Sequence, residues 1–413
     1  MGRPLPRWTP SVRQTFTALH YPNYRLWFTG QLVSLVGTWM QNTAQGYLIF
    51  QLTHSTAYLG YVGFAAGLPT WLFMLYGGVV ADRLPRRNLL VLTQSAMMAL
   101  AFLLAALTFT HLVQPWHIVA LAFGLGLANA FDAPARVSFV RELVDRDDLT
   151  NAIALNGSMF NAATVVGPAV AGLTYTLLGP AWSFTLNGLS FIAVITALRL
   201  MKLERVTPPP RNSSTLAELK DALAFVARHR VIRTLIGLTG VSSLVGLGFA
   251  TLLPAWAVNI LGGDATTNGL LQSARGIGAL VAALMIASLG RFQFRGKLLT
   301  LGSLIYPVLL LAFAATRWLP LALAALVGAG WGMVTMFNLA NALVQTVVPD
   351  ELRGRVLSVY TLTFFGLMPV GALWAGAAAE YLGEPATVIM GALIALGHAA
   401  IVWARVPQLG ATK

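Results

Sequence analysis

Cysteine is absent from this chain of 413 residues, and charged residues make up only 10% of it. Without cysteine there can be no disulfide, no thiolate metal site and no thiol nucleophile. A soluble protein usually has about 25% charged residues, whereas 57% of this sequence is hydrophobic. So little polar surface cannot cover a water-soluble globule of this length. Lipid must therefore cover most of the molecule.

Acidic residues are scarce, and the excess of basic residues gives a net charge of +13. In a soluble protein such a charge would suggest a nucleic-acid partner, but its distribution argues against one here. Every Lys and Arg except Arg275 and Arg317 falls near a chain end, or in or beside every second connection between apolar runs. This bias follows the positive-inside rule, so we expect a bacterial inner-membrane protein with both termini in the cytoplasm. No nucleic-acid partner is expected.

Apolar runs of roughly twenty residues recur about twelve times between Tyr24 and Arg405. Lipid cannot hydrogen-bond the backbone, so each run must be a helix or a strand of a closed barrel. Runs of this length exclude the alternating strands of about ten residues that form barrels. The predicted fold class is an all-α membrane protein with twelve transmembrane helices. We predict spans at residues 25–51, 57–81, 89–110, 116–137, 152–178, 181–201, 232–260, 265–289, 298–316, 319–346, 356–379 and 385–404.

A polar, proline-rich stretch divides these spans into two sets of six. We assign residues 1–201 to an N-terminal six-helix bundle, 202–231 to a cytoplasmic linker with an amphipathic helix, and 232–413 to a C-terminal bundle. The halves also share a pattern, because Asp147-Asp148-Leu149 precedes the fifth span and Asp350-Glu351-Leu352 precedes the eleventh. Internal repeats of this kind are usual in transporters, so we predict two pseudo-symmetric bundles.

The connection after the second span contains the pattern G-x-x-x-D-R-x-x-R-R, formed by Gly78, Asp82, Arg83, Arg86 and Arg87. This pattern resembles the signature loop of the major facilitator superfamily. Further segments resemble a bacterial exporter branch of that superfamily, the transmembrane secretion effector family, which contains enterobactin exporters and macrolide-efflux proteins. The segments that carry this resemblance are residues 23–27, 37–41, 131–136 and 151–156.

The resemblance implies two bundles that rock about a central site, with the signature loop acting as a cytoplasmic latch. Asp82 would accept hydrogen bonds from a helix N-terminus and from an arginine of a neighbouring segment. Arg83 and Arg87 would engage acids across the bundle. Breaking these bonds would bias the change between conformations. The alternative is that the arginines only fix the topology of the chain.

One face of the first span and one face of the tenth are polar, which would be costly against lipid. We expect both faces to line a central substrate cavity, with an aromatic surface for hydrophobic or ring-bearing ligands. The alternative is that these side chains only join neighbouring helices. The faces consist of Gln31, Thr38, Asn42 and Gln45 in the first span, and Trp331, Asn338 and Asn341 in the tenth.

Arg275 is the one charge well inside a predicted span, where it is flanked by Gln272. A buried arginine needs water, a partner or an anionic ligand, and the other spans offer no deep acid to pair with it. We therefore expect Arg275 and Gln272 to contact an acidic substrate. The alternative is that Arg275 extends to the external surface.

Asp132 and Arg136 lie one helical turn apart near the cytoplasmic end of the fourth span. A membrane proton carrier needs an acid or a histidine held where burial can shift its pKa, and Asp132 is the most plausible one here. The pair could equally be a structural salt bridge.

The fifth span carries Gly167, Pro168 and Gly172, which resemble the glycine-proline motif of exporters. Proline removes a backbone donor, and small neighbours let helices approach closely, so this segment could bend as a hinge or seal the external side. A plain packing kink is the alternative.

The sequence contains no phosphate-binding glycine loop, paired histidines or facing carboxylates, so we expect no enzyme, no cofactor and no metal site. Transport must then draw on an ion or substrate gradient. We expect a monomeric secondary active exporter of amphipathic small molecules such as drugs or siderophores, working by alternating access and proton antiport in contact with membrane lipid. The alternatives are a lipid or lysophospholipid translocator, and a membrane scaffold or sensor that does not transport.

Overall fold

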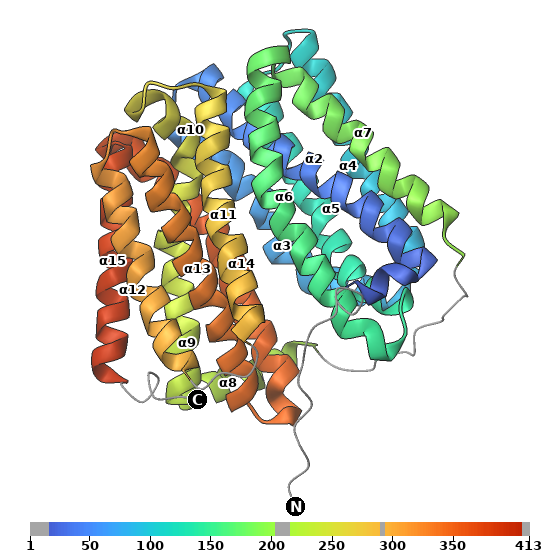
Figure 1. Ribbon diagram of the computed structural model, residues 1–413, viewed down its shortest axis with the longest axis vertical. Coiled ribbons are helices and arrows are strands. Elements are labelled where there is room, and N and C mark those ends of the chain that lie inside the picture. Colours follow the sequence, from blue (N-terminus) through green and yellow to red (C-terminus); the bar gives the residue numbers. More distant parts are fainter. Residues whose placement is uncertain (1–15, 203–214, 290–293, 407–413) are drawn as a thin grey trace, which may run out of the picture.

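The structure is a computed structural model in which residues 16–202, 215–289 and 294–406 are described. Within these ranges every regular element is a helix, which confirms the all-α fold class (Figure 1). Most of the predicted linker, residues 203–214, lies outside the described ranges. The linker boundaries therefore stay a prediction.

The N-terminal half contains six long helices and three short 3-10 turns. The long helices are α2 Pro22–Thr53, α3 Thr56–Arg83, α4 Arg86–Phe109, α5 Pro115–Phe139, α6 Leu149–Leu178 and α7 Pro180–Leu200, and the turns are η1 Thr17–His20, η2 Val140–Glu142 and η3 Arg146–Asp148.

The C-terminal half follows a short helix, α8 Thr215–Arg228. Its seventh span is divided into α9 Arg230–Val241, the π segment η4 Ser242–Gly246, the 3-10 segment η5 Leu247–Leu252, α10 Leu253–Ala255 and the π segment η6 Trp256–Ile260. The remaining helices are α11 Ala265–Leu289, α12 Arg295–Ala315, α13 Leu319–Val347, α14 Asp350–Leu382 and α15 Glu384–Arg405.

Close backbone contacts explain why the seventh span is not one regular helix. A Cβ on Gly371 in α14 would collide with the carbonyl oxygen of Leu244. A Cβ on Gly391 in α15 would lie 2.5 Å from the carbonyl oxygen of Val245. Carbonyls of the irregular turns thus point at glycines of neighbouring helices, and π turns of this kind often occur at functional sites.

Among the described residues, ten helical segments are long and apolar enough to cross a membrane, and the bent helix α3 makes an eleventh. The one remaining predicted span, residues 25–51, is α2. Its 32 residues are long enough to cross a membrane, although its polar face lowers its hydropathy. It packs against α6 and α7 inside the N-terminal half, so other helices cover much of its length. Packing within the protein makes such a polar face tolerable in a membrane.

Both halves end their fifth helix in the same way, which reflects the predicted internal repeat. Gly179 after α6 has φ 91°, and Gly383 after α14 has φ 79°. Side chains disfavour such positive φ values, so glycine allows both helices to stop and the chain to reverse into the last helix of each half.

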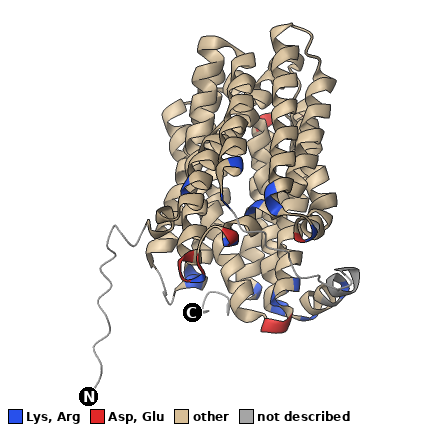
Figure 2. Ribbon diagram, turned by 90° about the vertical axis from the view of Figure 1, so that its right-hand side faces the viewer, with Lys and Arg blue, Asp and Glu red and all other residues tan. Residues whose placement is uncertain are grey.

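The halves meet chiefly at two helix pairs, α3 with α14 and α6 with α11. We call the end of the bundles where α2 begins and α15 ends the basic end, since most charged residues gather there (Figure 2). The opposite end, which carries the turns at His54 and Gly179, is the far end. In Figure 1 the two halves lean apart toward the basic end.

Candidate functional sites

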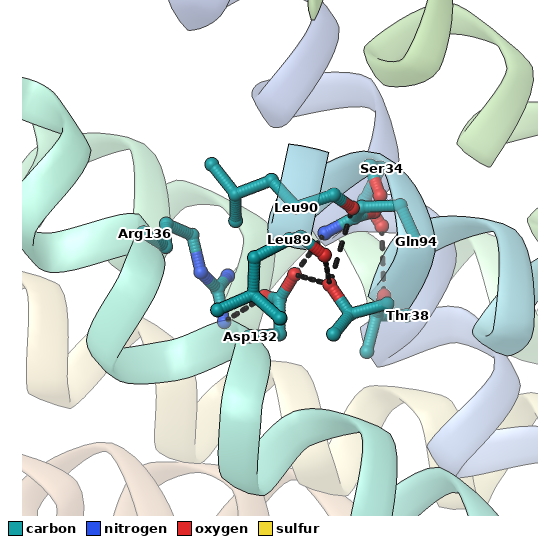
Figure 3. Close-up of polar contacts among 8 residues, drawn as sticks. Ser34, Thr38, Leu89, Leu90, Gln94, Asp132 and Arg136 are labelled. Carbon is teal, nitrogen blue, oxygen red and sulfur yellow. Dashed lines mark hydrogen bonds and ion pairs between the residues drawn. The ribbon is translucent and has the colours of Figure 1, made fainter. Parts of the chain in front are cut away.

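Asp132 in α5 is fully buried and has three polar partners (Figure 3). Its Oδ1 accepts hydrogen bonds from Thr93 Oγ1 at 2.9 Å and from Gln94 Nε2 at 2.8 Å, both from α4. Its Oδ2 lies 3.2 Å from the guanidinium of Arg136. The structure thus brings the predicted pair together and adds two residues that sequence reasoning missed. Their signal was a pair of adjacent polar residues in an apolar span.

A buried carboxylate is stable only when it is paired and hydrogen-bonded. Here Oδ1 has two neutral donors, whereas the interaction of Oδ2 depends on Arg136, whose side chain is 24% exposed. Loss of that ion pair would leave a buried charge without a counter-ion, which is costly. Arg136 is therefore the one charged partner of this carboxylate among the described residues.

The backbone near Asp132 also contacts the helix that ends in the signature loop. Pro134 lies inside α5, so the Ala130 carbonyl, four residues earlier, lacks its usual helical donor. Gly77 of α3 packs directly on that carbonyl. A side chain at position 77 would collide with it, so glycine is needed for this close approach of α3 to α5.

Side chains of the signature loop form ion pairs and a hydrogen bond with residues of the N-terminal half. Asp82 lies 3.7 Å from Arg86, which also pairs with Glu142 in η2. Arg87 donates a hydrogen bond at 2.6 Å to the carbonyl of Arg199 at the end of α7, and Arg83 is exposed. Gly78, the first residue of the motif, has open space beside it.

These contacts differ from those that the resemblance implied. Asp82 was expected to accept from a helix N-terminus, and Arg87 to engage an acid across the bundle, but here their partners are Arg86 and a backbone carbonyl. With the halves leaning apart at the basic end, the arginines turn to neighbours in their own half. The cytoplasmic latch formed by Asp82, Arg83 and Arg87 stays a prediction for a conformation closed at that end.

Hydrogen bonds at the basic end join two of the exporter-like segments, residues 23–27 and 151–156, and the residues just before them. Tyr24 donates from its hydroxyl to the Ala152 carbonyl at 2.8 Å, and the Ala18 amide donates to Asn151 Oδ1 at 3.0 Å. Tyr21 donates to Asp148 at 2.8 Å, and this bond to a carboxylate raises the pKa of Tyr21 to about 12. These residues join the start of α2 to the start of α6, which is a structural role.

The residues of the predicted polar face on α2 differ in how far they are buried. Gln31 and Gln45 are buried, Thr38 is half-buried and Asn42 is exposed. Asn42 lies nine residues from Val33, which is about 180° around a helix. Val33 is an exposed apolar residue suited to lipid, so Asn42 faces the interior side of the bundle.

On α13 the predicted residues are also accessible. Trp331 is half-buried, and Asn338 is exposed. Asn341 accepts a hydrogen bond at 2.6 Å from Gln345 of the same helix. Because these side chains have no cross-helix hydrogen bonds among the described residues, they do not act as polar links between helices in this conformation.

Arg275 lies ten residues after the start of α11, or about 15 Å along its axis, near the middle of the span. It has no ion pair or hydrogen bond within the described residues and is only half-buried. Ile277 and Leu284 are exposed on the lipid-facing side of α11, whereas helical spacing places Gln272 and Arg275 on the other side. The depth of Arg275 and its position away from lipid argue against extension to the surface.

Unsatisfied polar atoms lie in the same part of the C-terminal half. Asn268, one turn before Gln272, is fully buried with neither amide atom hydrogen-bonded within the described residues. Tyr306 of α12 interacts electrostatically with Arg275, and its buried hydroxyl also lacks a described partner. Buried polar atoms without partners are costly, so this region is suited to a polar ligand or to water. Sequence reasoning missed Asn268 and Tyr306.

Comparison with known proteins identifies the family. A family model described as transmembrane secretion effector matches residues 13–413. The chain belongs to this family of major facilitator transporters. It is therefore a transporter and not an enzyme.

Relatives of this family member include transporters and efflux pumps from several bacteria. The multidrug efflux pump Tap of Mycolicibacterium fortuitum is 29% identical over 385 residues, which cover 88% of this chain and 91% of that protein. The staphyloferrin A transporter of Staphylococcus aureus is 24% identical, with 87% and 90% covered. The enterobactin exporter EntS of Escherichia coli is 25% identical, with 83% and 81% covered.

Solved transporter structures share the fold. A peptide transporter, POT, superimposes with a TM-score of 0.75 at 12% identity, covering 97% of this chain and 99% of that chain. The nucleoside transporter NupG gives a TM-score of 0.72 at 14% identity, covering 93% and 98%. At such identities the likeness shows the fold alone.

In this transporter the predicted hinge lies where α6 crosses two other helices. A Cβ on Gly167 would lie 2.5 Å from Trp39 of α2, and one on Gly172 would lie 2.9 Å from the Ala265 carbonyl of α11. The Pro168 carbonyl packs on Gly269. The helix stays continuous through Pro168, so this segment is a close helix crossing here, and bending stays a prediction.

The hydrogen bonds that join the halves of the transporter lie between the far end and the middle of its helices. Glu380 of α14 accepts from Ser55, from Thr56 and from the Ala57 amide at 2.8–3.1 Å, and so caps the start of α3. Between α6 and α11, the hydroxyls of Thr176 and Thr266 lie 2.9 Å apart. An acid at a helix N-terminus is favourable, so Glu380 stabilises closure of the far end.

Replacing Glu380 with alanine is expected to open the far end about fivefold more often, a modest effect because the carboxylate is solvent-exposed. Nitroxide labels on cysteines introduced at Leu112 and Trp318, both exposed at the far end, would report a larger population of long distances. Glu384→Ala is the control, since Glu384 accepts from Asn259 within its own half. Equal distance distributions in Glu380→Ala and the parent would contradict the prediction.

Proposed function

We propose that this protein is a bacterial inner-membrane exporter of siderophores or drugs, driven by proton antiport through alternating access. Two observations together carry the proposal. The halves are closed at the far end, and Arg275, at mid-membrane depth, has no ion pair or hydrogen bond among the described residues. The positive-inside rule places the basic end in the cytoplasm, so the halves lean apart toward the side from which an exporter loads. The relatives named as efflux pump and as exporter support this direction.

Coupling is proposed to occur at Asp132. Its burial and its dependence on Arg136 mean that charge and proton can be exchanged when α4 and α5 shift. The contact of Gly77 with Ala130 supports a link to the signature loop, because movement of α3 must displace the backbone beside Asp132. Proton binding and latch opening would then favour the same conformation.

Substrate is proposed to bind between the halves, with Arg275 and Gln272 on the C-terminal side. Asn42 and Thr38 face the interior from α2, and Trp331 and Asn338 are accessible on α13. Gly330 of α13 packs on the Arg275 carbonyl, so Arg275 and the adjacent Trp331 lie on touching stretches of two helices. A cation and an aromatic ring on two touching helices suit a ligand that is both anionic and ring-bearing.

Substitution of Arg275 with glutamine should selectively reduce transport of substrates that carry a carboxylate, by about 10- to 100-fold, since a charged hydrogen-bonded pair is lost. Uptake of a rhodamine with a free carboxylate would be compared with uptake of its methyl ester, in proteoliposomes. Arg275→Lys is the matched control, because it keeps the charge, and should lose less. Equal loss for both dyes would mean that Arg275 is structural.

The proposed function is tested with purified protein in liposomes that have an acidic lumen and a trapped pH-sensitive dye. External addition of a catechol siderophore, a cationic drug or a lipophilic dye should accelerate proton release from the lumen. Protein-free liposomes correct for drugs that collapse the gradient themselves. If no substrate moves protons while labelled lysolipid crosses, the exporter proposal fails in favour of lipid translocation, and if nothing crosses, a scaffold or sensor is left.

A further inference from the structure

A small groove lies outside the substrate path, on the N-terminal half at the basic end. It has a volume of about 390 Å³ and is lined by Arg87, Asn88, Val91, Leu92, Ser95 and Arg199. The groove lies between the start of α4 and the end of α7, which pack on each other and occupy the outer side of this half, away from α11–α15 (Figure 1). It therefore opens toward lipid and not toward the centre of the transporter.

The charges in this groove lack a counter-ion. Arg87 and Arg199 both line it, and Arg87 donates to the backbone carbonyl of Arg199, so the guanidinium of Arg87 lies beside the end of α7. Neither has a carboxylate partner within the described residues. Two like charges in one groove repel each other unless an anion lies between them, and the start of α4, with no side-chain cap, adds further positive potential.

The rest of the groove matches a lipid. Leu92 is 67% exposed beside it, and Leu200 next to Arg199 is 63% exposed, so the groove is apolar on the membrane side of its arginines. Ser95 lies two turns beyond Asn88, about 10 Å deeper along α4. A phospholipid has the matching arrangement. Its anionic phosphate lies at the membrane surface, level with the arginines, and its acyl chains lie deeper, level with the apolar residues.

We propose that this groove binds the headgroup of an anionic phospholipid of the cytoplasmic leaflet, through Arg87, Arg199 and Asn88. Arginine suits this role because its planar guanidinium can donate two hydrogen bonds to one phosphate. The inference does not depend on the transported substrate. It assigns a second role to Arg87, which otherwise belongs only to the predicted latch.

The test is native mass spectrometry of the delipidated full-length protein, titrated with phosphatidylglycerol or with phosphatidylcholine. The unmodified chain should retain phosphatidylglycerol preferentially. Each arginine near an anionic headgroup contributes roughly fivefold in affinity, so Arg87→Gln/Arg199→Gln should bind about thirtyfold more weakly. Arg199→Gln alone should bind about fivefold more weakly, and it leaves the latch residues unchanged.

The matched control is Arg141→Gln/Arg146→Gln, which removes the same charge from exposed positions at the basic end outside the groove. This control should bind phosphatidylglycerol like the parent, and all variants should melt at the same temperature in phosphatidylcholine. Equal loss in both double variants would mean that only overall charge matters and would overturn the proposal. Displacement of the lipid by free glycerol phosphate at millimolar concentration would show that the groove is an ordinary anion site.

Discussion

Substrate-driven proton release should be lost, by at least about tenfold, when Asp132 is replaced with asparagine. Asparagine has the same shape, and its side-chain oxygen can still accept from Thr93 and Gln94. What disappears is the charge and the site that binds a proton. Arg136 loses its partner but is 24% exposed, so water can solvate it and the fold should survive.

The measurement is the rate of luminal alkalinisation after substrate addition, in the proteoliposomes described above. Asp145→Asn is the control, because it removes one negative charge from an exposed residue at the basic end. Downhill movement of substrate without a pH gradient should persist in Asp132→Asn, since alternating access does not itself need the proton. Unchanged proton release would show that Asp132 and Arg136 are only a structural salt bridge.

Closure of the far end should be lost when Gly376 in α14 is replaced with leucine. A Cβ at this position would lie 2.6 Å from the Thr56 carbonyl oxygen and 2.7 Å from the Gly60 Cα, both backbone atoms of α3. Backbone cannot move aside like a side chain, so α3 and α14 must separate. Overpacking usually costs about 1–3 kcal/mol, which would reduce the closed population about 5- to 150-fold relative to the open one.

The absence of native cysteine makes this measurable without background. Cysteines introduced at Thr176 and Thr266, whose hydroxyls lie 2.9 Å apart, should form a disulfide when the far end is closed. This pair joins α6 to α11, so it reports on closure independently of the substituted pair α3 and α14. Cross-linking should be at least about fivefold slower in Gly376→Leu.

Gly397→Leu in α15 is the matched control, since nothing lies within 4 Å of a Cβ at that position. It should cross-link at the parent rate. Parent-like cross-linking in Gly376→Leu as well would mean that α3 and α14 can adapt to the larger side chain, and that close approach at Gly376 is not required for closure.

Some interactions were predictable because they depend on residues near each other in the chain. Arg136 follows Asp132 by one turn, so any helix brings them together. Thr93 and Gln94 are about 40 residues away on another helix, and nothing in their own span indicates that they meet Asp132. The cap on α3 is a stronger case, since Glu380 lies 325 residues from Ser55.

The sequence by itself determined that this is a helical membrane protein, because hydropathy, span length and the placement of Arg and Lys follow from contact with lipid and water, which each segment meets on its own. Its motifs, through their resemblance to the major facilitator superfamily, indicated a transporter. Only the tertiary structure decided which residues face one another across helices. The division of the seventh span into π and 3-10 turns, the partner of Arg87 and the lack of an ion pair for Arg275 among the described residues all depend on neighbouring helices. Such contacts are set by the packing of the two halves, and that packing changes between conformations while the sequence pattern does not.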